Sequence, residues 1–499
     1  MKADRKGLAA GALALALSAC ATQSGPSTPQ PSADPQYSGW VEGQSLGEVG
    51  VSVDVDWWRR FDDPVLIDLI EEARANEPGL RQALARVEEA RALAAISEAA
   101  GGPNVSAGAS TARQRQSENA GGPAGAIPGV PLEQDQFTAD LSAAWEIDLF
   151  GRLARREEAA EARFRATQED FRAASLALIA QVAVTYFDYR AAQREQALQV
   201  RNEALAEETV ALTRTRFEAG ADSEQALRAA LAALESVHAD GPAIEARLRS
   251  GRAALAVLTG SSPHQADMLD LGPADTPVAA PPVPLGLPSE LLRRRPDVRA
   301  AEARLSAANA DTAAARADRF PAFSLTGDFG GASTSLDDLA AAGSETWSIA
   351  AIIDWPIFQA GRLQAAIEAA EARGDGAEAA YGAAVLGAFR DVETALARYV
   401  GLVEEARRTE RALQEQRQAL DLARARFEAG ATNLLPLLDA QRETIGLETR
   451  LERVLNARAT AQVGLYRALG GGWSAQAVHD GAGSAQIASS QRTRNRDAQ

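Results

Sequence analysis

The chain has 499 residues, with 68 acidic and 51 basic side chains, three histidines and one cysteine. A formal net charge of −17 makes it a poor candidate for binding nucleic acid, which attracts basic surfaces. A single cysteine excludes an internal disulfide and a metal site built from several cysteines.

The first twenty residues predict a lipoprotein signal peptide. Residues 1–19 begin with basic side chains and continue with an apolar run, as export signals do. Leu17-Ser18-Ala19-Cys20 then matches the bacterial lipobox, so we expect cleavage before Cys20 and attachment of lipid to it. A chance cysteine behind an ordinary signal peptide is the alternative. Residues 20–56, rich in Pro, Ser and Gly, are predicted to tether this lipid in the outer membrane to the folded part.

Two helices are predicted at the start of the folded part, which begins at Trp57. Apolar residues from Leu66 to Ala73 recur at helical spacing. Pro78 suits the first turn of a second helix, which runs to about residue 100.

The hydrophobic period then changes from that of a helix to that of a strand. Within a strand predicted at about 135–149, residues 137–149 alternate strictly, with apolar side chains at odd positions and mostly polar ones at even positions. The same alternation returns at 345–357, and more weakly at 103–115 and 321–331. We therefore expect two β-hairpins. A small soluble sheet is the alternative to membrane-spanning strands. Because four strands cannot close a barrel, a membrane barrel needs two, three or four copies of the chain.

Long proline-free runs with heptad spacing predict two helices, over 151–219 and 361–429, each about 100 Å long. Return helices are expected over 222–260 and 432–470. Gly241-Pro242 is predicted to break or kink the first return helix.

The two long helices end in the same six residues, Arg-Phe-Glu-Ala-Gly-Ala, at 216–221 and 426–431. Glycine just beyond a helix end enters the left-handed region without strain, so both copies predict tips at which the chain reverses. The shift of 210 residues between the two copies also relates Gly151 to Gly361 and indicates a duplicated chain, with repeats at 57–260 and 286–470. Residues 261–285 are the predicted linker and 471–499 a polar tail. The fold class expected is mainly α with a β membrane part.

Nothing in the sequence predicts catalysis. His238, His264 and His479 stand in unrelated contexts and are expected at the surface. There is no Ser/His/Asp set, phosphate loop or metal-ligand spacing, so we expect no enzyme, no cofactor and no metal.

Several short motifs, in order over about residues 57–470, together carry a resemblance to a known family. They are Trp57-Trp58, Asp63-Pro64, Ala85-Arg86-Val87, Trp145 to Arg152, Gly286 to Ser289, Arg294 to Asp297, Phe320-Pro321 and Leu437 to Arg442. With them the chain resembles the TolC-like outer membrane factors, specifically the NodT-type lipoprotein channels of efflux pumps.

The resemblance implies a homotrimer with a twelve-stranded barrel in the outer membrane, continued by an α-helical barrel across the periplasm. It also implies a periplasmic membrane-fusion adaptor and an inner-membrane RND-type pump as partners, with small molecules or drugs passing outward through a passive duct. Two rivals remain: the outer channel of a type I protein-secretion system, and a coiled-coil spacer lipoprotein with no pore. The sequence does not predict the cargo, because the inner-membrane pump would select it.

Candidate functional residues are then expected in three places. The tips would dock the adaptor through residues found in both copies: Arg214, Arg216, Phe217, Gly220, Arg424, Arg426, Phe427 and Gly430. The polar strand positions would give the pore an acidic lumen: Asp140, Glu146, Asp148 and Asp354.

Asp421 is the candidate gate residue, since the equivalent position 211 is alanine and a charge in one copy alone suits a lock. It would pair with Arg424 or with an arginine of a neighbouring chain. The alternative is an ordinary solvated helix charge.

Overall fold

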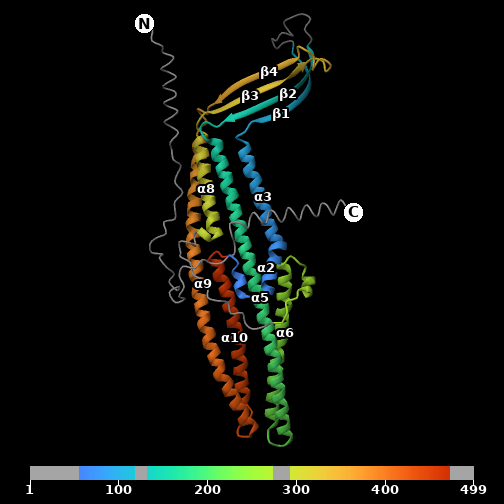
Figure 1. Ribbon diagram of the computed structural model, residues 1–499, viewed down its shortest axis with the longest axis vertical. Helices are drawn as coiled ribbons and strands as arrows, with labels where there is room; N and C mark the ends of the chain where they lie inside the picture. Colours follow the sequence, from blue (N-terminus) through green and yellow to red (C-terminus); the bar gives the residue numbers. More distant parts are fainter. Residues whose placement is uncertain (1–54, 118–131, 274–292, 472–499) are drawn as a thin grey trace, which may run out of the picture. The chain divides into compact units, whose positions relative to one another are not determined.

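A computed structural model of the protein describes residues 55–117, 132–273 and 293–471. The first repeat holds η2 (Trp57–Phe61), α2 (Pro64–Asn76), α3 (Pro78–Ala99), β1 (Asn104–Arg115), β2 (Glu133–Ile147), α5 (Arg152–Glu218), α6 (Glu224–Leu258) and η3 (Pro263–Met268). The second holds α8 (Pro296–Ala317), β3 (Ala322–Ser333), β4 (Glu345–Asp354), α9 (Arg362–Glu428) and α10 (Leu435–Ala468). Helix, hairpin, long helix and return helix follow one another in both (Figure 1), so the chain is duplicated.

Some predicted segments fall outside these residues. They are the signal peptide with Cys20, the tether up to residue 54, residues 274–285 of the linker, His479 and the tail beyond residue 471.

The described chain forms two compact units. One contains the strands and comprises residues 88–166 and 301–381, apart from the gap between β1 and β2. The other is helical and comprises residues 55–87, 167–300 and 382–471, apart from the gap in the linker.

In the first unit the strands form one antiparallel sheet, with the order β1-β2-β3-β4 (Figure 1). Residues of equal parity pair throughout: Val105 lies opposite Ala143, and Phe323 lies opposite Ile353. Between the repeats, Phe137 of β2 lies opposite Ser333 of β3. Because successive side chains alternate between faces, all odd positions share one face of the sheet and all even positions share the other. The pairing of β2 with β3, which joins the two repeats, therefore keeps the odd positions of both repeats on the same face of the sheet.

In the helical unit the start of the folded part is anchored by aromatic rings. Trp57 and Trp58 are fully buried, and Trp57 stacks on Tyr466 of α10 with ring centroids 5.0 Å apart. The predicted apolar face of the next helix is confirmed, since Leu66 and Ile70 have no exposed surface.

Of the break or kink predicted at Gly241-Pro242, the break is wrong, because α6 runs without interruption from Glu224 to Leu258 with Pro242 inside it. Packing on α5 supports the turn before the proline. There the side-chain amide of Gln199 donates a hydrogen bond to the carbonyl of Val237. Tertiary contacts of this kind outweigh a local loss of one backbone hydrogen bond.

Candidate functional site: the polar sheet face and the helical tips

The sheet separates apolar from polar side chains by position parity. The odd face carries large exposed apolar residues, among them Phe329, Trp347 and Ile349. The even face carries hydroxyls and carboxylates that bond to one another across strands. Ser106 bonds to Ser142 at 2.8 Å, and Ser348 donates to Asp328 at 2.9 Å. These four residues occupy one row across the sheet.

Asp140 belongs to the next row of the even face and lies between two glycines. Gly108 faces it from β1 and Gly330 from β3. A methyl group on Gly330 would come within 2.9 Å of the Asp140 Cβ atom and closer still to the backbone of β2, so only glycine fits opposite Asp140 on β3. Asp328, one row away, was not among the predicted lumen residues. Its even position beside Phe323, Leu325 and Phe329 could have revealed it.

The other three predicted lumen acids differ from one another. Asp354 ends β4 on the even face and is exposed. Glu146 is on the even face too, but Arg152 donates to both of its carboxylate oxygens, at 2.5 and 2.6 Å. Asp148 lies beyond the strand and accepts the backbone N–H of Ala154 at 2.8 Å, in the first turn of α5. Glu146 and Asp148 therefore connect the strand to the helix and are not free lumen charges.

The strand ends are held by a pair of equivalent tryptophans. The indole N–H of Trp145 donates to the carbonyl of Gly101 at 3.0 Å, and that of Trp355 donates to Arg319 at 3.2 Å. Each bond ties the end of a strand to the end of the helix before that hairpin. The duplication therefore extends to individual hydrogen bonds.

Both predicted tips have the same backbone geometry. Gly220 and Gly430 have φ of 73° and 71°, in the left-handed region. Ala221 N–H bonds to the Arg216 carbonyl at 2.8 Å, and Ala431 N–H bonds to Arg426 at 2.9 Å. This 6→1 bond, together with the bond from each glycine N–H, is a Schellman motif, which explains why the glycine is needed.

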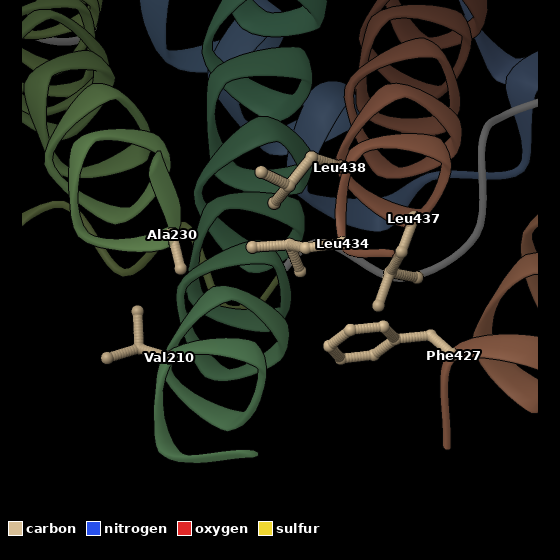
Figure 2. Close-up of a cluster of buried hydrophobic side chains, with 6 residues drawn as sticks. All are labelled: Val210, Ala230, Phe427, Leu434, Leu437 and Leu438. Carbon is tan, nitrogen blue, oxygen red and sulfur yellow. The ribbon is translucent and has the colours of Figure 1, made fainter. Parts of the chain in front are cut away.

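We call α5 and α6 the first hairpin, and α9 and α10 the second. Near the tips the two hairpins share one apolar cluster of buried residues: Val210, Ala230, Phe427, Leu434, Leu437 and Leu438. Figure 2 shows the Phe427 ring pointing from α9 toward Leu434 and Leu437. The side chains of Leu212 and Leu420 lie at the edge of this cluster.

Arg216 of the first hairpin packs against the Phe427 side of this apolar cluster. The Arg216 guanidinium lies 4.7 Å from the centroid of the Phe427 ring and donates to the Phe427 carbonyl at 3.0 Å. Asp222 holds it in place through a 2.7 Å bond. Arg214, Phe217 and Arg426, by contrast, are exposed.

Arg424 does not pair with Asp421, so that version of the gate is wrong. Its guanidinium donates to Glu428 at 2.9 Å and to Glu208 of the first hairpin. These two carboxylates raise the pKa of Arg424, with the Glu428 bond as the larger cause. Asp421 is exposed and has no ionic partner among the described residues, which leaves a link to a neighbouring chain as the remaining form of the hypothesis.

The rest of the described chain holds no group of three His, Cys, Asp or Glu residues placed to bind a metal ion. His238 and His264 are exposed, as expected. Within the described residues, no helix combines the length and apolar content that crossing a membrane requires.

Comparison with known proteins gives a consistent picture. The family model described as outer membrane efflux protein matches residues 69–261 and 287–471, one segment in each repeat. The outer membrane protein OprJ of Pseudomonas aeruginosa is 37% identical over 476 residues, covering 95% of this chain and 97% of OprJ. The toluene efflux pump outer membrane protein TtgF of Pseudomonas putida is 35% identical over 473 residues, covering 93% of this chain and 96% of TtgF.

Among solved structures, the outer-membrane channel OprN matches with a TM-score of 0.82 and 32% identity, covering 90% of this chain and 99% of OprN. The family model spans well over half of the chain, and the relatives match nearly all of it. The chain is therefore an outer-membrane protein and belongs to the outer membrane efflux protein family.

Proposed function

We propose that three copies of the chain form the outer-membrane channel of a tripartite efflux pump. An inner-membrane RND-type transporter would expel small molecules through a periplasmic adaptor into this passive duct. The observation that carries the proposal is the sheet, in which four long strands keep one apolar and one polar face.

The apolar face is suited to lipid. Trp347 and Ile349 are each 74% exposed and Phe329 is 63% exposed, and all the large exposed apolar residues of the strands except Ile352 stand at odd positions. Exposed apolar surface of this extent marks a membrane or protein contact. A membrane barrel alternates apolar residues outside with polar residues inside, and this sheet has that arrangement.

The sheet edges require further copies of the chain. Among the described residues, β1 and β4 each pair on one side only, and unpaired strand edges are not tolerated in lipid. Eight strands are about the smallest closed barrel, so one copy is too few, and three copies supply twelve strands. The relative TtgF, described as part of a toluene efflux pump, supports small molecules as the cargo.

The test compares two neighbouring substitutions on β4. Ile349→Asp puts a charge on the odd face, and Ala350→Asp puts the same charge on the even face. In cells that lack their own efflux channel but carry a periplasmic adaptor and an RND-type pump that match this protein, the wild-type protein should lower accumulation of a fluorescent pump substrate. Ala350→Asp should retain this activity, whereas Ile349→Asp should lose membrane insertion and activity together. Equal tolerance of both changes, or a purified protein that remains monomeric and forms no pore in bilayers, would refute the proposal.

A further inference from the structure

The two tips have identical sequences but unequal surroundings. Phe427 is completely buried, whereas Phe217, at the same place in the first tip, is 38% exposed. Arg216 bonds to Asp222 and to the Phe427 carbonyl, while Arg426 is exposed and has no partner among the described residues. In the contact within one chain, the first hairpin therefore uses its arginine but not its phenylalanine, and the second hairpin uses its phenylalanine but not its arginine.

The contact within one chain has a direction, from the first hairpin to the second. Within one chain, the first hairpin supplies the arginine and the second hairpin supplies the phenylalanine. The arginine of the second hairpin, Arg426, and the phenylalanine of the first, Phe217, take no part in this contact. A ring of copies built head to tail presents the second hairpin of each copy to the first hairpin of the next.

We propose that Arg426 of each copy packs on the Phe217 ring of the next copy, and so repeats between chains the Arg216–Phe427 contact made within each chain. The proposal rests on the homotrimer of the proposed function. Its occupant is a second copy of this chain, because the buried contact inside the chain already shows how these two tip surfaces fit together.

Other contacts at this interface can be transposed by the same 210 residues. Four of the six residues of the apolar cluster keep an apolar counterpart: Leu420 stands in place of Val210, Ala440 in place of Ala230, Phe217 in place of Phe427 and Leu227 in place of Leu437. Leu434 and Leu438 do not, because Glu224 and Arg228 stand in their places. Two carboxylates are not retained. Thr432 stands in place of Asp222, which holds Arg216, and Gln418 stands in place of Glu208, which pairs with Arg424. The contact between copies therefore keeps the cation–π pair and part of the apolar cluster but lacks two ionic bonds, so the tips should separate more readily between copies than within one.

The test is a pair of cysteines joined by a short thiol-specific linker in the assembled trimer. Cys20 is the only native cysteine, and the Cys20→Ala background removes it. Phe217→Cys with Arg426→Cys should give covalently linked dimers and trimers on a denaturing gel. The matched control, Arg216→Cys with Phe427→Cys, should react inside one chain and remain monomeric on the same gel.

Sedimentation of each variant before cross-linking separates this inference from the homotrimer itself. The variants could sediment as trimers, with the control reacting inside its own chain, and yet give no intersubunit product through residues 217 and 426. That result would overturn the contact and leave the proposed function intact. Absence of trimers in the wild-type protein would overturn both.

A second measurement compares alanine variants with the wild-type trimer and needs no cysteines. Phe217→Ala and Arg426→Ala should each lower the temperature at which trimers dissociate, and the double variant should be no worse than the more damaging single one. Strictly additive losses would show that the two side chains do not touch and would overturn the contact.

Discussion

The phenol of Tyr186 on α5 donates a 2.6 Å hydrogen bond to Asp63, the residue that caps the N-terminus of α2. The same carboxylate accepts the backbone N–H groups of Val65 and Leu66 at 3.0 and 3.2 Å. Burial is the main cause that raises the pKa of Tyr186, and the bond to Asp63 raises it further. The hydroxyl is thus held in its neutral, donating form, and it links a long helix to the start of the folded part.

Tyr186→Phe should therefore lower the free energy of unfolding by about 1–3 kcal/mol, because the half-buried carboxylate of Asp63 loses a donor. Tyr466→Phe is the matched control, since its hydroxyl is buried without a partner in the described part of the chain. Removing that hydroxyl should leave stability unchanged or raise it. Denaturant unfolding of both variants checks this, and equal losses would contradict the assigned role of Tyr186.

Glycine at position 330 should be essential for the sheet. A Cβ atom there would lie 2.7 Å from the Cα atom of Asp140, which forces the strands apart and costs about 1–3 kcal/mol per chain. Gly327→Ala is the control, because its Cβ atom would approach only the Ser348 carbonyl, at 3.7 Å. We expect Gly330→Ala to reduce the yield of detergent-resistant oligomer and Gly327→Ala to leave it unchanged. Similar yields for the two variants would contradict the packing described here.

The even face of the sheet should make the reconstituted pore prefer K⁺ over Cl⁻, because rings of carboxylates attract cations. Asp140→Asn and Asp328→Asn should each lower this preference. Glu146→Gln should change it less, since Arg152 already balances that charge. Reversal potentials in a salt gradient measure the preference. A pore that favours Cl⁻, or an effect of Glu146→Gln larger than that of Asp140→Asn, would contradict the assignment of the faces.

Asp421 remains a candidate for a lock between neighbouring copies. If it holds the tips closed, Asp421→Ala should give longer or larger openings in single-channel recordings while the oligomer stays intact. Glu208→Gln serves as the comparison, because it weakens a bond that Arg424 makes within one chain. Conductance and open probability unchanged in Asp421→Ala would leave Asp421 as an ordinary solvated charge.

The lipid anchor is predicted at Cys20. The intact mass of the mature protein should equal that of residues 20–499 plus the attached acyl groups. Cys20→Ala should abolish the added mass, yet the oligomer should still insert, because the barrel itself is an anchor. An unmodified cysteine in the wild-type protein, or cleavage at another position, would show the lipobox interpretation to be wrong.

Features encoded by local spacing were determined by the sequence alone. Alternation in 137–149 assigns each of these side chains to a face, and the structure extends the same parity across all four strands. The glycines at 220 and 430 mark helix ends because few other residues enter the left-handed region without strain. The 210-residue shift between them revealed the duplication, since repeated sequence needs no knowledge of contacts.

Only the tertiary structure decided which partner each of these residues has. Phe217 and Phe427 stand in identical hexapeptides, yet one is exposed and the other is buried under Arg216. Arg424 lies three residues from Asp421 but pairs with Glu208 of the other hairpin. Periodicity describes the geometry of one element, whereas these environments depend on which hairpin packs against which. That packing is set by contacts between residues more than two hundred positions apart, and no local pattern records them.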